Sequence, residues 1–234
     1  MYNVEVVSIK CLCVIFLTGE KMKLSKLFKR MIDVTASLFF LILLAPVLMI
    51  SICAVFILEG RPVFYISRRY IALGRIVSII KLRSMVKDAK SVKFNLKGRY
   101  MRDGYLNIPL DCEVYTGVGR FLEKTQLVEI PQLFNILFHG MSLIGNRPLP
   151  AENVEKIEKI PGWQDRFACP AGITGISQIV GKHNLEPIER LKLEGLYSRV
   201  YNEGNVIKCD LMIVYYTVRL VLRGQQLSIE NAYQ

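Results

Sequence analysis

The uncharged apolar stretch from Val34 to Leu58 constrains this chain more than any other part of its sequence. It contains no Asp, Glu, Lys or Arg, and a helix needs roughly 20 apolar residues to cross the hydrocarbon core of a bilayer. Near its middle lies Pro46, which removes a backbone hydrogen-bond donor and clashes with the preceding turn. The stretch therefore predicts a membrane segment with a kink at Pro46.

Basic residues flank the apolar stretch on both sides and bear on its topology. Lys29 and Arg30 precede it, and Arg61 and Arg75 follow it. Basic flanks favour the cytoplasmic side of a membrane. A re-entrant segment that turns back at Pro46 places both flanks there, whereas a kinked helix that spans the membrane places only one. We favour the re-entrant form, with the rest of the chain on the cytoplasmic face.

The chain divides into three parts along its length. Residues 1–20 are an N-terminal extension that fits either a strand or a dispensable segment. Residues 21–58 join a basic amphipathic helix to the membrane segment, because apolar residues recur among lysines at helical spacing before the apolar stretch. Residues 59–234 form a cytosolic domain, in which the apolar run 211–222 fits either core packing or bilayer contact.

Composition narrows the class of partner. The chain has 31 Lys and Arg against 20 Asp and Glu, a net charge of +11, which predicts an anionic partner. No nucleic-acid-binding motif is evident, so nucleic acid is not expected, and membrane lipids and a phosphate-bearing substrate are favoured. The six cysteines include no C-x-x-C pair, which argues against a disulfide framework and a zinc site.

Two β-rich runs, 63–67 and 76–82, predict a hairpin after the membrane segment. Lys81 and Arg83 at its end share one face of an extended strand. Two cations on one face can clamp a phosphate. The alternative is a strand edge whose charges only protect it from pairing.

The stretch 116–150 carries the other candidate site residues. Apolar positions between 127 and 138 follow helical spacing, and Pro131 is best tolerated in the first turn of that helix. Glu129 then lies at the helix start, where it either caps free amides or holds a divalent cation beside a phosphate. After the helix, a tight connection presents Arg147, which either grips phosphate oxygens or is an ordinary turn residue at the surface.

Several motifs in one order resemble those of the bacterial sugar transferase family, the monotopic polyprenyl-phosphate phosphoglycosyl transferases. The resemblance covers about residues 27–224. Its motifs are K-R and D before the apolar segment (Lys29, Arg30, Asp33), G-R-P-V-F (60–64), K-L-R-S-M (81–85), V-G-R-F-L (118–122), E-I-P-Q-L-F-N (129–135), M-S-L-I-G (141–145) with Arg147-Pro148, and G-I-T-G (172–175).

The resemblance implies a mostly helical α+β fold: a re-entrant membrane helix kinked at Pro46, and a small cytosolic domain with a β-hairpin and interfacial amphipathic helices. It places the protein at the inner leaflet of the bacterial cytoplasmic membrane. The implied activity is Mg2+-dependent transfer of a sugar phosphate from a UDP-sugar to undecaprenyl phosphate, which initiates capsule, exopolysaccharide, O-antigen or glycoprotein glycan assembly. Lys81, Arg83 and Arg147 would then bind substrate phosphate.

The family's catalytic pair is an adjacent Asp and Glu, and this chain departs from it. Glu129 matches the metal-binding Glu, but Val128 stands where the Asp nucleophile belongs. A valine side chain can neither attack phosphorus nor bind metal. Lesser departures include Asn146 for the first Pro of a Pro-Arg-Pro motif, Gly140 for an Asp and Ser67 for a Gln.

Two function classes follow from this mixture of matches and departures. The first is an active phosphoglycosyl transferase that uses direct attack by the lipid phosphate, or another carboxylate; the retained Glu129 and its cations favour it. The second is an inactive paralogue, favoured by Val128, that binds nucleotide sugar or lipid, or acts as a scaffold for partner enzymes such as later glycosyltransferases.

Overall fold

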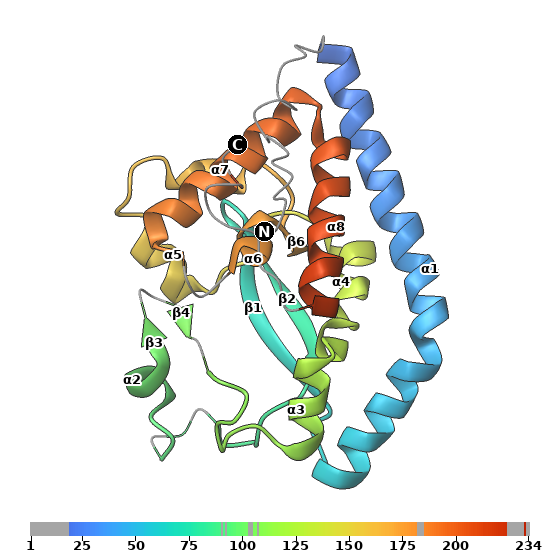
Figure 1. Ribbon diagram of the computed structural model, residues 1–234, viewed down its shortest axis with the longest axis vertical. Helices are drawn as coiled ribbons and strands as arrows, with labels where there is room; N and C mark the ends of the chain where they lie inside the picture. Colours follow the sequence, from blue (N-terminus) through green and yellow to red (C-terminus); the bar gives the residue numbers. More distant parts are fainter. Residues whose placement is uncertain are drawn as a thin grey trace, which may run out of the picture.

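The structure is a computed structural model that describes residues 19–89, 91, 93–102, 105–106, 108–181, 185–223 and 232. It is mostly helical, with a β-hairpin and one long apolar helix near its N-terminus, as the sequence predicts (Figure 1). The proposed extension at residues 1–20 lies almost wholly outside the described residues. The elements are α1 (Gly19–Glu59), β1 (Phe64–Ala72), β2 (Arg75–Leu82), α2 (Leu96–Tyr100), β3 (Met101–Arg102), β4 (Tyr105–Leu106), α3 (Gly117–Lys124), η2 (Leu127–Glu129), α4 (Gln132–His139), β5 (Ser142–Ile144), α5 (Ala151–Ile157), η3 (Trp163–Phe167), β6 (Gly172–Thr174), α6 (Ile176–Gly181), α7 (Pro187–Glu203) and α8 (Val206–Arg223).

Helix α1 joins the predicted basic helix and the predicted membrane segment in one helix of 41 residues. Pro46 lies inside it and does not end it. Figure 1 shows the axis of α1 bending toward the rest of the molecule in its second half. Within the described part of the chain, α1 is the one helix long and apolar enough to cross a membrane, by length and composition.

Polar contacts fix the first half of α1 to the rest of the protein. Lys29 Nζ lies 2.6 Å from Asp210 Oδ2 of α8, and Asp33 accepts hydrogen bonds from Ser142 Oγ and the backbone N–H of Leu143. Tyr197 donates a hydrogen bond to Asp210 and so belongs to the same group. We call Lys29, Asp33, Ser142, Tyr197 and Asp210 the polar latch. All five side chains are buried.

Apolar packing holds the other end of α1 against the same domain. Val55 is fully buried and packs with Leu82 of β2, Leu122 of α3 and Val128 of η2. The first half of α1 therefore contacts β5 and α8 through polar groups, and its last turns contact β2, α3 and η2 by burying apolar area.

The predicted hairpin is confirmed by the antiparallel pairing of β1 and β2. Tyr65 lies opposite Lys81, and Ser67 lies opposite Ile79. Side chains alternate along a strand, so Tyr65, Ser67 and Arg69 share the face that carries Lys81.

The principal core lies between α6, α7 and α8, with β5 and β6 beside it. Ile179, Leu193, Tyr197 and Ile213 form its centre and are almost fully buried. Strands β5 and β6 pair in parallel. The excursion from Lys87 to Tyr115, whose role the sequence left open, holds α2, β3 and β4 around a small apolar cluster of its own.

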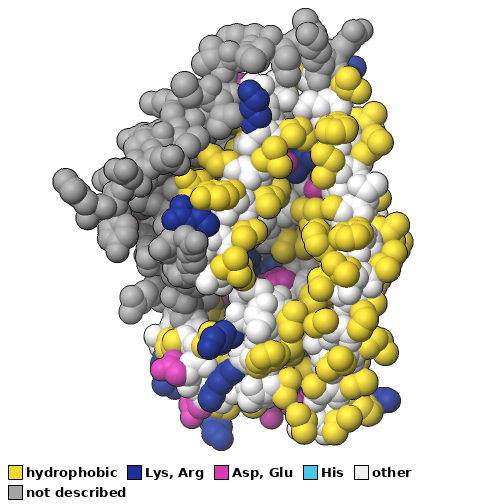
Figure 2. Space-filling model, turned by 45° about the vertical axis from the view of Figure 1, so that its right-hand side comes forward, with side chains coloured by type: hydrophobic (Ala, Val, Ile, Leu, Met, Phe, Trp, Pro, Cys, Tyr) yellow, Lys and Arg dark blue, Asp and Glu magenta, His cyan; other side chains and the backbone are white. Residues whose placement is uncertain are grey.

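A large part of the apolar surface remains outside these cores. Figure 2 shows hydrophobic side chains along the face that carries α1. Helix α8 packs into the core through Ile213, while other apolar side chains on it are exposed, so bilayer contact by this helix stays a prediction. These exposed residues recur at helical spacing and are Leu211, Val214, Tyr215, Val218, Val221 and Leu222.

Candidate functional site

Glu129 is the centre of the candidate site. It ends the short 3-10 helix η2, and its Oε1 atom lies 2.5 Å from Lys81 Nζ of β2. The helix expected to include Glu129 begins later, at Gln132, with Pro131 as its N-cap residue. The proline lacks an N–H, so it fits the position just before the first regular turn of α4.

Arg147 approaches Glu129 from the turn that follows β5. One of its guanidinium nitrogens lies 4.0 Å from Glu129 Oε1. The sequence predicted Lys81, Glu129 and Arg147 as site residues from three separate motifs, and the structure brings their side chains together.

Arg69 is a further cation of this group, and the sequence analysis did not select it. Burial and the neighbouring charge of Arg147 both lower the pKa of its guanidinium, while Tyr65 and Glu129 act in the opposite direction. Its Nε atom donates to Ser67 Oγ at 2.7 Å. Alternation of side chains along the strand, which also selected Lys81, could have identified Arg69. That step requires the register of the hairpin, which the sequence does not show.

The charge of this group is unbalanced. Lys81 and Arg147 lie within 4.0 Å of the Glu129 carboxylate, and Arg69 lies near enough for its charge to interact with those of Glu129 and Arg147. The side chains of Lys81 and Glu129 are 21% and 17% exposed, and that of Arg147 is 30% exposed, so solvent and solutes reach them. An excess of fixed cations that is partly open to solvent attracts an anion with several oxygens, such as a diphosphate. We call Lys81, Glu129, Arg147 and Arg69 the cation cluster.

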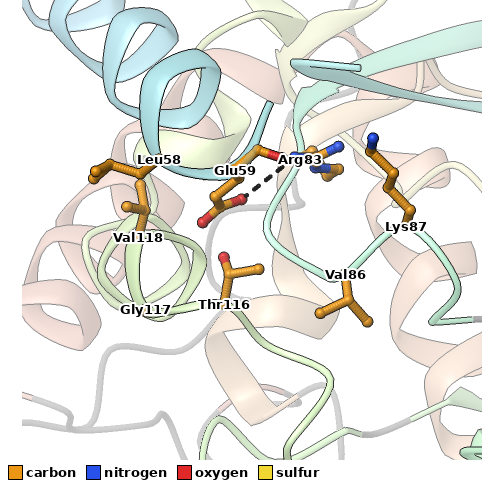
Figure 3. A pocket seen from close by; sticks show the side chains of 8 residues that line it. All are labelled: Leu58, Glu59, Arg83, Val86, Lys87, Thr116, Gly117 and Val118. Carbon is orange, nitrogen blue, oxygen red and sulfur yellow. Dashed lines mark hydrogen bonds and ion pairs between the residues drawn. The ribbon is translucent and has the colours of Figure 1, made fainter. Parts of the chain in front are cut away.

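The structure does not bring Arg83 into the cation cluster. Strand β2 ends at Leu82, and the Arg83 guanidinium donates instead to the carbonyl oxygens of Glu59 and Gly60, at 2.8 and 3.0 Å. It therefore satisfies carbonyls at the C-terminus of α1. Arg83 and Lys87 also line a cavity of about 570 Å3 with Glu59, beside the end of α1 (Figure 3). Phosphate binding by Arg83 stays a prediction.

Val128 has an apolar environment although Glu129 follows it directly. Its side chain is 1% exposed and packs with Val55, Leu82 and Leu122. Position 128 thus lies beneath the second half of α1, and its side chain supplies no nucleophile.

The described residues offer a magnesium ion one carboxylate at this place. No group of three or more His, Cys, Asp or Glu that could hold a metal ion occurs within the part of the chain that the structure describes. Mg2+ is commonly held by one or two carboxylates together with substrate phosphates. Glu129 fits that donor set when a diphosphate binds to the neighbouring cations.

Comparison with known proteins shows that the candidate site residues lie within the part of the chain that matches a known family. The sequence profile of the family described as bacterial sugar transferase matches residues 24–224, which include α1, the hairpin and the cation cluster. Position 128 is therefore inside the matched region.

Three curated relatives match most of this chain. The UDP-glucose:undecaprenyl-phosphate glucose-1-phosphate transferase of Klebsiella pneumoniae is 32% identical over 83% of this chain and 40% of its own length. The galactosyl transferase CpsE of Streptococcus agalactiae is 31% identical over 84% of this chain and 42% of its own. The undecaprenyl-phosphate galactose phosphotransferase of Salmonella typhimurium is 30% identical over 85% and 41%. The chain thus spans about two fifths of the length of these relatives.

Proposed function

Because the chain belongs to the bacterial sugar transferase family, we propose that it transfers a sugar phosphate from a UDP-sugar to undecaprenyl phosphate. The activities for which its relatives are named supply these substrate classes. The observation that carries the proposal is the cation cluster, in which Lys81 and Arg147 contact Glu129 and Arg69 adds a third positive charge nearby. Three cations beside one carboxylate suit the diphosphate of a UDP-sugar.

The environment of Val128 supports direct transfer without a covalent intermediate. In that reaction an oxygen of the lipid phosphate attacks the phosphorus that carries the sugar, and the bond from this phosphorus to the UMP oxygen breaks. UMP leaves, and the product is a sugar linked to the lipid through a diphosphate. Lys81, Arg69 and Arg147 would stabilise the charge on the transferring phosphoryl group and on UMP. When bound at Glu129, Mg2+ would neutralise further phosphate charge.

The contacts of α1 support a membrane placement at the cytoplasmic face. The first half of α1 is fixed to the domain by Lys29 and its second half by Val55, so both ends lie against one body. A straight span would carry one end to the far side of the bilayer, about 30 Å away. We therefore propose that α1 enters the inner membrane and returns, bent near Pro46, and that the exposed apolar side chains of α8 lie at the membrane interface.

Cysteine labelling in intact cells tests this topology. A Lys23→Cys probe and an Arg75→Cys probe should both resist a membrane-impermeant reagent added from outside, and both should react once the membrane is opened. Labelling of the Lys23→Cys probe from outside, with the Arg75→Cys probe protected, would show a full span. Pro46→Leu restores a backbone donor and should favour that span.

UMP release tests the activity. We expect purified protein in detergent to release UMP from a UDP-sugar when undecaprenyl phosphate and Mg2+ are present, and not when the lipid is omitted. Initial rates should follow ternary-complex kinetics, and the intact mass should show no sugar-phosphate adduct. Release without lipid, together with an adduct on Glu129 or another carboxylate, would contradict direct transfer and support covalent catalysis.

Val128 favours a second candidate, a protein that binds UDP-sugar or lipid and does not turn them over. A wild type that binds UDP but releases no UMP from a panel of UDP-sugars would support this candidate. The Val128→Asp variant then has diagnostic value, because turnover regained by the variant would identify an enzyme that lost its nucleophile. The burial of Val128 among Val55 and Leu82 means that this variant must also be checked for folding.

A further inference from the structure

The turn that carries Arg147 is held by close backbone packing. A Cβ atom at Gly145 would lie 2.2 Å from the carbonyl oxygen of Pro170, and one at Gly172 would lie 2.1 Å from the backbone nitrogen of Gly145. Only glycine allows these two segments to approach so closely. The backbone immediately before Arg147 therefore has a defined position.

A buried ion pair reaches the backbone of Arg147 from the other side. Arg166 Nε donates to Glu194 Oε2 at 2.7 Å, with the two side chains 1% and 0% exposed. A second nitrogen of the same guanidinium donates to the carbonyl oxygen of Arg147 at 2.8 Å. A buried ion pair is weak evidence for stability, because its desolvation offsets its attraction. Apolar residues in place of the pair could not make the hydrogen bond from Arg166 to the Arg147 carbonyl oxygen.

Asn146 links the same groups to the turn. Its Nδ2 atom lies 2.8 Å from the carbonyl oxygen of Arg166, 2.9 Å from that of Glu194 and 3.1 Å from Ser198 Oγ. Asn146 is 3% exposed. These contacts give a role to one of the positions where the chain departs from the motif of its family.

The position of the Arg147 guanidinium depends on this backbone. Its described contact is with Glu129 Oε1 at 4.0 Å, which is beyond hydrogen-bond range. We propose that Arg166, Glu194 and Asn146 form a positioning unit that fixes Arg147 beside Glu129 and so sets the affinity of the cation cluster for a diphosphate. The phosphate-binding part of this proposal rests on the proposed function.

A double-mutant cycle with UDP as the probe tests whether Arg166 acts through Arg147. Arg166→Lys keeps a positive charge beside Glu194, but one ammonium does not reproduce the fork that also holds the Arg147 carbonyl. We expect it to weaken UDP binding about tenfold, a coupling of ordinary size for residues in contact. In an Arg147→Ala background the same change should have no further effect, whereas in a Lys81→Ala background it should keep its full effect. An equal loss in both backgrounds would overturn the proposal.

Hydrogen exchange measures the positioning unit without any ligand. The backbone amides of residues 145–147 and 149 should exchange faster in Arg166→Lys and in Asn146→Ala than in the wild type. The control is Ser84→Ala, which removes a hydrogen bond to Glu123 outside the unit and should leave this segment unchanged. If Arg166→Lys does not fold, Asn146→Ala replaces it in both experiments.

The two measurements separate the two proposals. A wild type that does not bind UDP would disprove the phosphate site of the proposed function and the effect of the unit on affinity. Exchange at residues 145–149 would still decide whether the unit holds the turn. Unchanged exchange in both variants would contradict the positioning unit even if UDP binds.

Discussion

The polar latch and the cation cluster use similar side chains but differ in charge balance and exposure. In the latch, one cation, Lys29, lies between the carboxylates of Asp33 and Asp210, whose side chains are 5% and 11% exposed. In the cluster, Lys81 and Arg147 share Glu129, Arg69 adds a third positive charge, and the Arg147 side chain is 30% exposed. The latch is closed to solvent and its one cation lies between two carboxylates, so it serves to hold α1. The cluster is open and short of negative charge, so it can take an anion from outside.

The largest effect is expected from breaking the latch. Lys29→Met leaves Asp33 and Asp210 buried near one another without a cation, which should lower the free energy of unfolding by about 3–5 kcal/mol. Chemical unfolding in detergent micelles, followed by tryptophan fluorescence, measures it.

The matched control is an exposed ion pair. Lys97 and Glu152 have side chains 67% and 59% exposed, so Lys97→Met should change stability by less than about 1 kcal/mol. Adding Asp210→Asn to Lys29→Met should recover part of the loss, because it removes one of the two stranded carboxylates. Equal losses in Lys29→Met and Lys97→Met would remove the distinction between closed and open pairs.

In the cation cluster, the largest effect should come from Glu129. Glu129→Gln keeps the shape of the side chain and removes its charge, so we expect Mg2+-dependent UMP release to fall roughly 100- to 1000-fold, as when a group that stabilises transition-state charge is lost. The unfolding transition should hardly move. Mg2+-free binding of UDP should be unchanged or tighter, because the three cations lose their internal carboxylate. A variant that keeps wild-type turnover would reduce Glu129 to a structural partner of Lys81.

A smaller effect is expected from Arg147→Lys. The lysine keeps the charge but loses the planar fork that grips two phosphate oxygens, so UDP binding should weaken about tenfold. Isothermal titration at two salt concentrations measures it, and the exposed Arg199→Lys serves as the control. Equal affinity in the two variants would show that the cluster senses charge alone.

The smallest effect concerns the pH dependence of the latch. Burial raises the pKa of the Asp210 carboxyl above its ordinary value, although Lys29 and the Tyr197 hydroxyl act in the opposite direction. For an acid with a raised folded-state pKa, the contribution to stability is complete below its unfolded pKa and is lost as the pH rises through the folded pKa. The stability of the wild type minus that of Asp210→Asn should therefore fall as the pH rises above 3.8, the ordinary pKa of this carboxyl. A difference that stays constant with pH would contradict this.

The sequence predicted the parts of the molecule that depend on local pattern. Strand alternation placed Lys81, the apolar run placed most of α1, and the motif around Glu129 placed the centre of the cluster. The parts that depend on packing at long range were not predictable from it. Placing Arg69 beside Lys81 requires the register of the hairpin. Arg83 donates to a carbonyl oxygen at the end of α1 instead of continuing the strand face of Lys81.

Boundaries were also set by packing that the sequence does not display. The spacing from 127 to 138 predicts one helix, but the chain forms a 3-10 turn, a proline and then α4. Pro46 predicts a kink, and α1 continues through this residue as one helix, since proline removes only one donor and a helix can absorb that loss by bending. The burial of Val128 depends on α1 lying over it, which no local pattern states.

The latch also has a consequence for the order in which the protein is made. Lys29 and Asp210 are 181 positions apart in the chain, so a ribosome that adds about 5–20 residues per second completes the second partner roughly 10–40 s after the first. Until then the ammonium group of Lys29 lacks its partner on α8. Contacts of α1 with β2, α3 and β5 can form earlier, but the ion pair that joins α1 to α8 must wait until translation has passed Asp210.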